Sequence, residues 1–148
     1  MNILIRKDWR TVQLVGKLTL GECVVSSQFP QLALQITPTV EQAENAFVLA
    51  NFLYKVVESA FGKPFIHSWI RDFNLNYAVG GVTNSGHLLG SSMDFSCPDA
   101  TETPEEIFNF LLKDLDWPGE LFLHRKTNGL HADLPRLGVW MDRKILDK

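Results

Sequence analysis

Residues 39–61 read TVEQAENAFVLANFLYKVVESAF and carry the longest apolar pattern of the chain. The apolar residues recur at intervals of three and four: Val40, Ala43, Phe47, Ala50, Tyr54, Val57 and Phe61, with Ala46, Leu53 and Ala60 beside them. This spacing predicts an amphipathic helix of about six turns whose apolar stripe lies in the core. Thr37 or Thr39 can cap its start beside Pro38, and Gly62 gives the expected end.

A second helix is expected from Thr103, because Thr103-Pro104-Glu105-Glu106 forms a capping box with proline at the first helical position. Short apolar runs bounded by turn residues predict strands at 64–70, 91–96, 120–124 and 129–134. This order predicts an α+β fold in which a small mixed or antiparallel sheet is flanked by helices.

The ends of the chain carry weaker signals. Residues 18–25 predict a short helix after an irregular or extended opening, followed by a loop around Phe29 and Pro30. The tail at 138–148 suits either an edge strand or a docking segment for a partner.

The composition of the chain excludes several classes of function. With 148 residues, 45% of them hydrophobic, the chain suits one domain spanning 1–148. The net charge of -3 offers no positive field for nucleic acid, and no run is long and apolar enough for a membrane span. The first ten residues do not resemble a signal peptide. Cys23 and Cys97 lie too far apart in sequence for a CxxC metal motif, and we expect packed thiols rather than a disulfide framework.

Three side chains able to bind a metal occur on or beside the predicted strands: His87, Asp94 and His131. Two histidines and one carboxylate are a ligand set that zinc accepts at hydrolytic sites, with water in the fourth position. The spacing alone is a weak signal, because ordinary surface or core histidines often show it by chance. His67, on the first predicted strand, is expected to pack in the core or at the rim of a pocket.

The segment Ser85-x-His87-x-x-Gly90-x-Ser92-x-Asp94 resembles the S-x-H-x-x-G-x-A-x-D signature of the zinc D-Ala-D-Ala carboxypeptidases, a family that includes L-Ala-D-Glu endopeptidases of phages and distant hedgehog-type relatives. Residues 65–81, which include Arg71 and end in Ala-Val-Gly-Gly, resemble a conserved stretch of the phage-type members. Residues 130–136 resemble their V-H-V-S-L-R-P ending. The likeness thus runs in the right order from about Leu18 to Arg136.

The resemblance implies a role for each matching residue. His87, Asp94 and His131 would be zinc ligands, Arg71 would steady the polarised carbonyl of the substrate, and Ser85 would lie near the substrate's carboxylate. It also implies a hedgehog-like or D-Ala-D-Ala-peptidase-like fold, a peptidoglycan peptide as substrate, and a phage or prophage origin, in the host cytoplasm or on the virion. For Arg71 a surface salt bridge, and for Ser85 a simple turn hydroxyl, are the alternatives.

The chain departs from this family at the general base, an acid expected a few residues before the last histidine ligand. Positions 125–128 hold Arg, Lys, Thr and Asn. His124 occupies the place where phage-type relatives often have Glu, and a neutral imidazole can accept a proton there. Glu120 and Asp133 are the other candidates, although Asp133 also suits a supporting contact to a metal ligand.

Two functions therefore stay open. One is an active zinc peptidase that uses His124 or a displaced acid as base. The other is a zinc-stabilised structural or binding module that has lost the base, with other phage structural proteins as partners.

Overall fold

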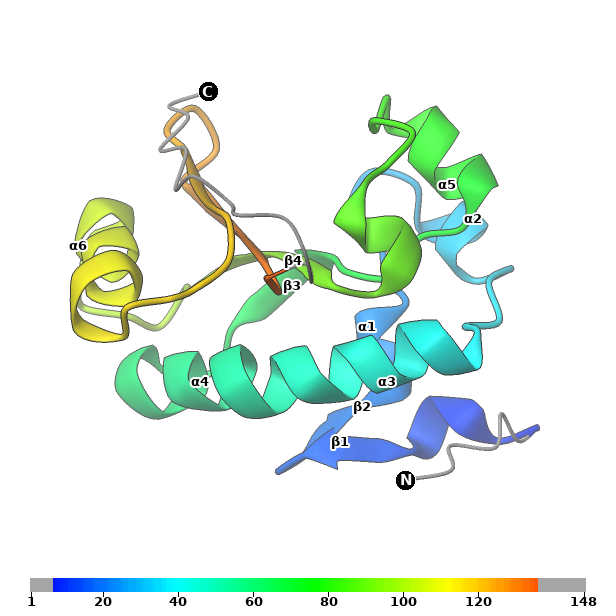
Figure 1. Cartoon of the computed structure of the whole chain (residues 1–148), viewed down its shortest axis with the longest axis horizontal. Helices are drawn as coiled ribbons and strands as arrows, with labels where there is room; N and C mark the ends of the chain where they lie inside the picture. Colours follow the sequence, from blue (N-terminus) through cyan, green and yellow to red (C-terminus); the bar gives the residue numbers. More distant parts are fainter. Residues whose placement is uncertain (1–6, 136–148) are drawn as a thin grey trace.

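The computed structural model describes residues 7–135, which form an α+β fold with two sheets (Figure 1). The larger sheet is antiparallel throughout, with its four strands in the order β3-β4-β6-β5. These strands are β3 (Phe65–Ser68), β4 (Ser92–Ser96), β5 (Leu121–His124) and β6 (Gly129–Asp133). Each lies within its predicted range. The tail at 138–148 lies outside the described residues.

The long helix predicted at 39–61 is confirmed. It runs without a break as α3 (Val40–Leu49), a π-helical stretch η2 (Ala50–Tyr54) and α4 (Lys55–Phe61). Thr39 is the N-cap: its hydroxyl accepts a hydrogen bond from the backbone N–H of Gln42, whose side chain accepts one from the backbone N–H of Thr39. Gly62, at a φ of 85°, ends the helix in the left-handed region that favours glycine.

Most of the predicted stripe is buried, but the prediction was wrong at its two ends. Val40 is 44% exposed, and Ala60 is exposed as well. At the first turn Gln42 turns inward in place of Val40, because buried carbonyls beside the helix need its hydrogen-bond donors. At the last turn Ala60 shares the exposed side of the helix with Ser59.

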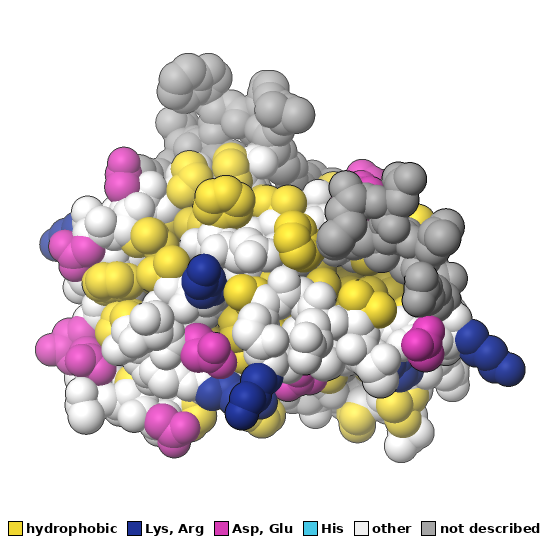
Figure 2. All heavy atoms as spheres, turned by 90° about the horizontal axis from the view of Figure 1, so that it is seen from below, with side chains coloured by type: hydrophobic (Ala, Val, Ile, Leu, Met, Phe, Trp, Pro, Cys, Tyr) yellow, Lys and Arg dark blue, Asp and Glu magenta, His cyan; other side chains and the backbone are white. Residues whose placement is uncertain are grey.

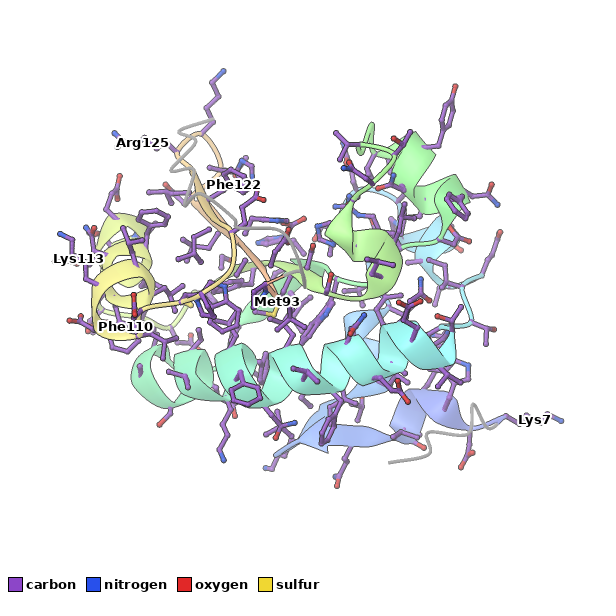
Figure 3. All side chains as sticks on the ribbon, in the orientation of Figure 1. Lys7, Met93, Phe110, Lys113, Phe122 and Arg125 are labelled. Atoms are coloured by element: carbon purple, nitrogen blue, oxygen red, sulfur yellow. The ribbon has the colours of Figure 1, made fainter. Side chains whose placement is uncertain are left out.

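The long helix lies between the two sheets (Figure 1). On one side is the hairpin of β1 (Gln13–Val15) and β2 (Leu18–Thr19), which Asn51 contacts by donating to the carbonyl oxygen of Leu14 at 3.4 Å. On the other side is the apolar face of the larger sheet, and Figure 3 shows Met93 of β4 directed toward the helix.

Shorter elements complete the described chain: η1 (Trp9–Thr11), α1 (Leu20–Cys23), α2 (Pro30–Ala33), α5 (Phe73–Ala78), η3 (Gly86–Leu89), α6 (Pro104–Asn109) and the π-helical η4 (Phe110–Asp114). The helix expected at 18–25 is confined to α1, because Leu18 and Thr19 pair in β2. The loop expected around Phe29 and Pro30 ends at Phe29: Pro30 begins α2, where its fixed φ suits the first helical position.

The capping box predicted at Thr103 is confirmed. The Thr103 hydroxyl accepts from the backbone N–H of Glu106, and the Glu106 carboxylate accepts from the backbone N–H of Thr103. Within residues 7–135, no helix has the length and apolarity that a bilayer crossing requires.

The first turns of the long helix hold the segment that contains His87. The Gln42 side-chain nitrogen donates to the carbonyl oxygens of Arg71 at 3.1 Å and Leu88 at 2.9 Å. Gly90 follows η3 at a φ of 72°, and a Cβ there would lie 2.3 Å from the Gln42 carbonyl oxygen. The motif glycine thus serves both a left-handed turn and a close approach to the helix.

We expect Gly90→Ala to lower the free energy of unfolding by more than about 3 kcal/mol, because it adds a backbone clash to the strain of a positive φ. Gly80→Ala is the matched control, since Gly80 has a φ of 73° and nothing within 4 Å of an added Cβ. That control should cost only about 1 kcal/mol, the strain alone. Urea unfolding of both variants measures the difference, and equal losses would contradict the close approach.

Candidate metal centre

His87 is held by backbone contacts on two sides. It lies on η3, where the Ser85 hydroxyl accepts from its backbone N–H at 3.3 Å. Its ring Nδ1 lies 2.7 Å from the carbonyl oxygen of Trp69, a buried residue directly after β3. A carbonyl can only accept, so Nδ1 carries a proton, and Nε2 is the ring nitrogen that faces Asp94 and would bind a metal ion.

Asp94 and His131 face each other across the sheet. They are register partners on β4 and β6, and His131 Nδ1 lies 2.5 Å from Asp94 Oδ1. The other carboxylate oxygen of Asp94 lies 3.1 Å from His87 Nε2. The second ring nitrogen of His131, Nε2, lies 2.7 Å from Asp133 Oδ1. Strand alternation puts these side chains on the face opposite the buried Met93, Leu130 and Ala132.

One atom from each of His87, Asp94 and His131 lies within 4.8 Å of the other two, so this group can hold a metal ion. The predicted ligands are therefore brought together. Each histidine has its remote nitrogen beside an oxygen, the Trp69 carbonyl or the Asp133 carboxylate, which is the arrangement that orients histidines at metal sites. Two imidazoles and a carboxylate suit several divalent transition metals.

Arg71 closes the side of the site nearest Asp94. Its Nη2 lies 3.1 Å from Asp94 Oδ2, its Nε donates to the Ser68 hydroxyl at 2.9 Å, and its Nη1 donates to Asn76 Oδ1 at 3.4 Å. The side chain is only 11% exposed, so this ion pair is not the surface salt bridge that the sequence left open. Burial lowers the pKa of Arg71, and Asp94 opposes that shift.

The carboxylates and His131 shift one another's ionisation. Burial opposes the ionisation of Asp94, but His87 and His131 outweigh it and hold its pKa well below the usual range. Burial also opposes the charging of His131, yet its contacts with Asp133 and Asp94 raise its pKa to about 10. The pKa of Asp133 is lowered by His131 despite burial. In the metal-free chain the buried charges of this cluster are thus paired.

His124 lies apart from the three ligands but shares a cavity with one of them. The cavity has a volume of about 340 Å³, and His124, His67 and Asp94 are among its lining residues. His67 is thus at a pocket, one of the two positions expected for it. Its ring nitrogens lie 3.0 Å from the Ser96 hydroxyl and 3.2 Å from the Ser27 hydroxyl.

The other candidate residues have structural contacts. The Ser85 hydroxyl caps η3, which is the turn role that the sequence left open, and a substrate contact remains a prediction. Glu120 lies just before β5, and its carbonyl oxygen accepts from the backbone N–H of Asp133 at 2.9 Å. Neither residue belongs to the group that can hold a metal.

All four histidines of the chain fall within the described residues, and none is visible on the face drawn in Figure 2. The long helix and the hairpin lie on that side (Figure 1). On the other side Phe122, which Figure 3 places on the β5–β6 hairpin, packs its ring 5.3 Å from that of His131. The group that can hold a metal ion therefore lies on one face of the sheet.

Two residues that position the site, Gln42 and Trp69, carried no functional signal in the sequence. A third, Asn76, lies in the stretch that resembles the phage-type peptidases, but the resemblance gave it no role. Asn76 is buried, accepts from Arg71 and donates to the Val82 carbonyl oxygen at 2.9 Å. Their contacts join segments far apart in the sequence, and a local pattern does not encode such contacts.

We expect the protein to bind one metal ion per chain and His87→Ala to weaken that binding by more than about 100-fold, beyond the cost of losing an outer contact. Isothermal titration with zinc and with cobalt measures it. His67→Ala is the matched control, a histidine on the same face outside the ligand set. Equal loss in both variants, or no uptake by the wild type, would contradict this centre.

Metal stabilisation should also grow with pH. Because the folded pKa of His131 is about 10, above its ordinary value, its proton stabilises the metal-free chain fully below about pH 6.5, and this contribution is lost as the pH rises toward the folded value. A metal ion needs the neutral ring and competes with that proton. The rise in Tm on adding zinc should therefore be larger at about pH 8 than at about pH 6, as calorimetry can measure. An equal rise at both would show that His131 is not the titrating ligand.

Comparison with known proteins adds no assignment: no protein-family model matches this chain, and no curated protein matches it either. The resemblance to zinc D-Ala-D-Ala peptidases therefore remains a prediction from the motifs of residues 65–94 and 130–136. The residues at the centre establish, on their own geometry, a group that can hold a metal ion.

Proposed function

We propose that this chain is a zinc-dependent peptidase that hydrolyses peptide bonds containing D-amino acids in peptidoglycan. The observation that carries the proposal is the convergence of His87, Asp94 and His131 to within 4.8 Å on one sheet face. These are the residues that the motif resemblance names as ligands. A hedgehog-like or D-Ala-D-Ala-peptidase-like fold and a phage or prophage origin belong to the same proposal.

Zinc is the metal that we propose for this donor set. Structural zinc sites are usually closed by four protein ligands, whereas hydrolytic sites keep three and leave a position for water. Within residues 7–135 this group offers three ligands. A bound zinc ion would supply a Lewis acid and lower the pKa of its water toward about 7.

His124 is the proposed base. It lines the same cavity as Asp94, on the strand next to the one that carries His131. A neutral imidazole can accept a proton, which is the chemistry that a general base supplies. The cavity of about 340 Å³ falls within the range of small-molecule sites and gives a substrate side chain room beside the base.

Arg71 would act on the substrate by hydrogen bonding. A guanidinium has five N–H donors, and three nitrogens here contact Ser68, Asn76 and Asp94. Donors remain for an oxygen of the substrate, and their positive charge would favour an oxygen that becomes negative as the bond breaks.

A second candidate function is a zinc-stabilised module without catalytic activity, and the position of Asp133 favours it. Its carboxylate faces Nε2 of His131, the ring atom remote from Asp94, and so it is badly placed to act as base at the metal. Since positions 125–128 carry no acid, we assign proton transfer to His124. Should neither His124 nor Glu120 serve, the chain would be a zinc-stabilised structural or binding module of a phage particle.

The test is hydrolysis of purified peptidoglycan and of a D-Ala-D-Ala peptide by the zinc-loaded protein. His124→Ala should lower kcat by about 10²- to 10⁴-fold, the usual contribution of a general base, while zinc stays bound. Lys126→Ala, an exposed change in the same hairpin, is the control and should keep full activity. Zinc bound without cleavage of either substrate would reject the peptidase and leave the binding module.

A further inference from the structure

The backbone of Asp133 is fixed on both sides by the turn that precedes β5. Its N–H donates to the Glu120 carbonyl oxygen at 2.9 Å, and its carbonyl oxygen accepts from the indole Nε1 of Trp117 at 2.9 Å. A Cβ on Gly119 would lie 1.8 Å from that same carbonyl oxygen. The turn is thus packed directly against Asp133.

The side chain of Asp133 is buried beside the His131 ring and Ser92. It is 8% exposed, and its Oδ1 lies 2.7 Å from His131 Nε2. The register partner of Asp133 on β4 is Ser92, which is fully buried. Ser92 Oγ and Asp133 Oδ1 are the two buried side-chain atoms, among residues 7–135, that lack a hydrogen bond of good geometry.

The Ser92 hydroxyl is the costlier of the two atoms, because Asp133 Oδ1 keeps its close contact with His131 Nε2. A buried polar atom without a partner costs about 1–3 kcal/mol, and native chains keep few of them. Ser92 and Asp133 lie opposite each other, and Asp133 contacts the proposed metal ligand His131.

We propose that Asp133 is a positioning residue of the metal centre, which holds His131 with Nδ1 toward Asp94 and His87, and that Ser92 steadies its carboxylate. The inference rests on the proposed zinc centre. An aspartate at Nε2 fixes which ring nitrogen carries the proton and makes the imidazole a stronger ligand. The turn at Trp117–Gly119 packs against the backbone of Asp133 and so fixes where its carboxylate lies.

The test compares zinc affinity, by competition with a chelator, in three variants. Asp133→Asn keeps the shape of the side chain and removes its charge, and the affinity should fall about 10- to 100-fold. Ser92→Ala keeps every charge and should not lower the Tm of the metal-free chain, since the hydroxyl makes no hydrogen bond of good geometry there. It should weaken zinc binding by a smaller factor, because the Asp133 carboxylate loses the hydroxyl opposite it. Asp99→Asn, an exposed change of the same type, is the control and should leave the affinity unchanged.

A second readout separates positioning from general stabilisation. Imidazole nitrogen NMR resolves the protonation of each ring, and the chain has only four histidines to assign. In the zinc-loaded wild type His131 should carry its proton on Nε2, with the metal on Nδ1. In Asp133→Asn that signal should shift or split, whereas the His87 signals should stay in place.

The outcomes divide cleanly. Wild-type affinity in both Asp133→Asn and Ser92→Ala, with zinc binding still abolished by His87→Ala, overturns this inference and leaves the zinc centre intact. If the wild type takes up no zinc, the proposed function fails as well. If Asp133→Asn does not fold, Ser92→Ala decides: weaker zinc binding at an unchanged Tm supports the inference, and unchanged binding overturns it.

Discussion

The side-chain amide of Gln42 is the contact on which the arrangement of the candidate metal centre depends. It is buried at the start of the long helix, accepts from the backbone of Thr39, and donates to the carbonyl oxygens of Arg71 and Leu88. Each bond contributes only about 1 kcal/mol net, but each carbonyl left without a partner would cost about 1–3 kcal/mol. The Gln42 side chain therefore joins the start of the helix to the segment of Arg71 and to the segment of Leu88, which carry Arg71 and His87 toward Asp94.

The remaining ligands depend on the pairing of β4 with β6. Asp94 and His131 are opposite each other there, so their separation is set by the spacing of neighbouring strands rather than by loop conformation. His87 approaches on η3, whose backbone is held by Gly90 against the helix and by the Arg71 N–H, which donates to the His87 carbonyl oxygen at 3.0 Å. A rigid sheet thus supplies two ligands and a clamped turn supplies the third.

Sequence patterns predicted the elements that are long or strongly capped. The helix from Val40 to Phe61 repeats its apolar spacing for many turns, and the helix after Thr103 begins with a capping box. The helices α2 and α5, of four and six residues, span too few turns for a period to emerge. Tertiary contacts decide where they form, as for α5, whose buried Asn76 is tied to Arg71 and Val82.

The residues of the site likewise fall into those that the sequence predicted and those that it did not. The three ligands could be named from residue type and motif, and strand parity correctly put Asp133 on the face of His131. The exposure of Val40 and the burial of Gln42 could not be predicted, because both follow from the carbonyl groups of residues 71 and 88. Long-range hydrogen bonds of this kind have no signature in the local sequence.

The alternation along β6 has a consequence for how the chain folds. His131 lies on the site face between Leu130 and Ala132, both of which are buried on the other face. A slip of one residue in the pairing of β6 would bury His131 and present Ala132 in its place, because side chains alternate with a period of two. A mispaired chain would then lack a ligand, and a metal ion that binds only the native form would draw the folding equilibrium toward correct pairing. The ion would thereby act as a selector of strand alignment during folding, independent of any later chemistry.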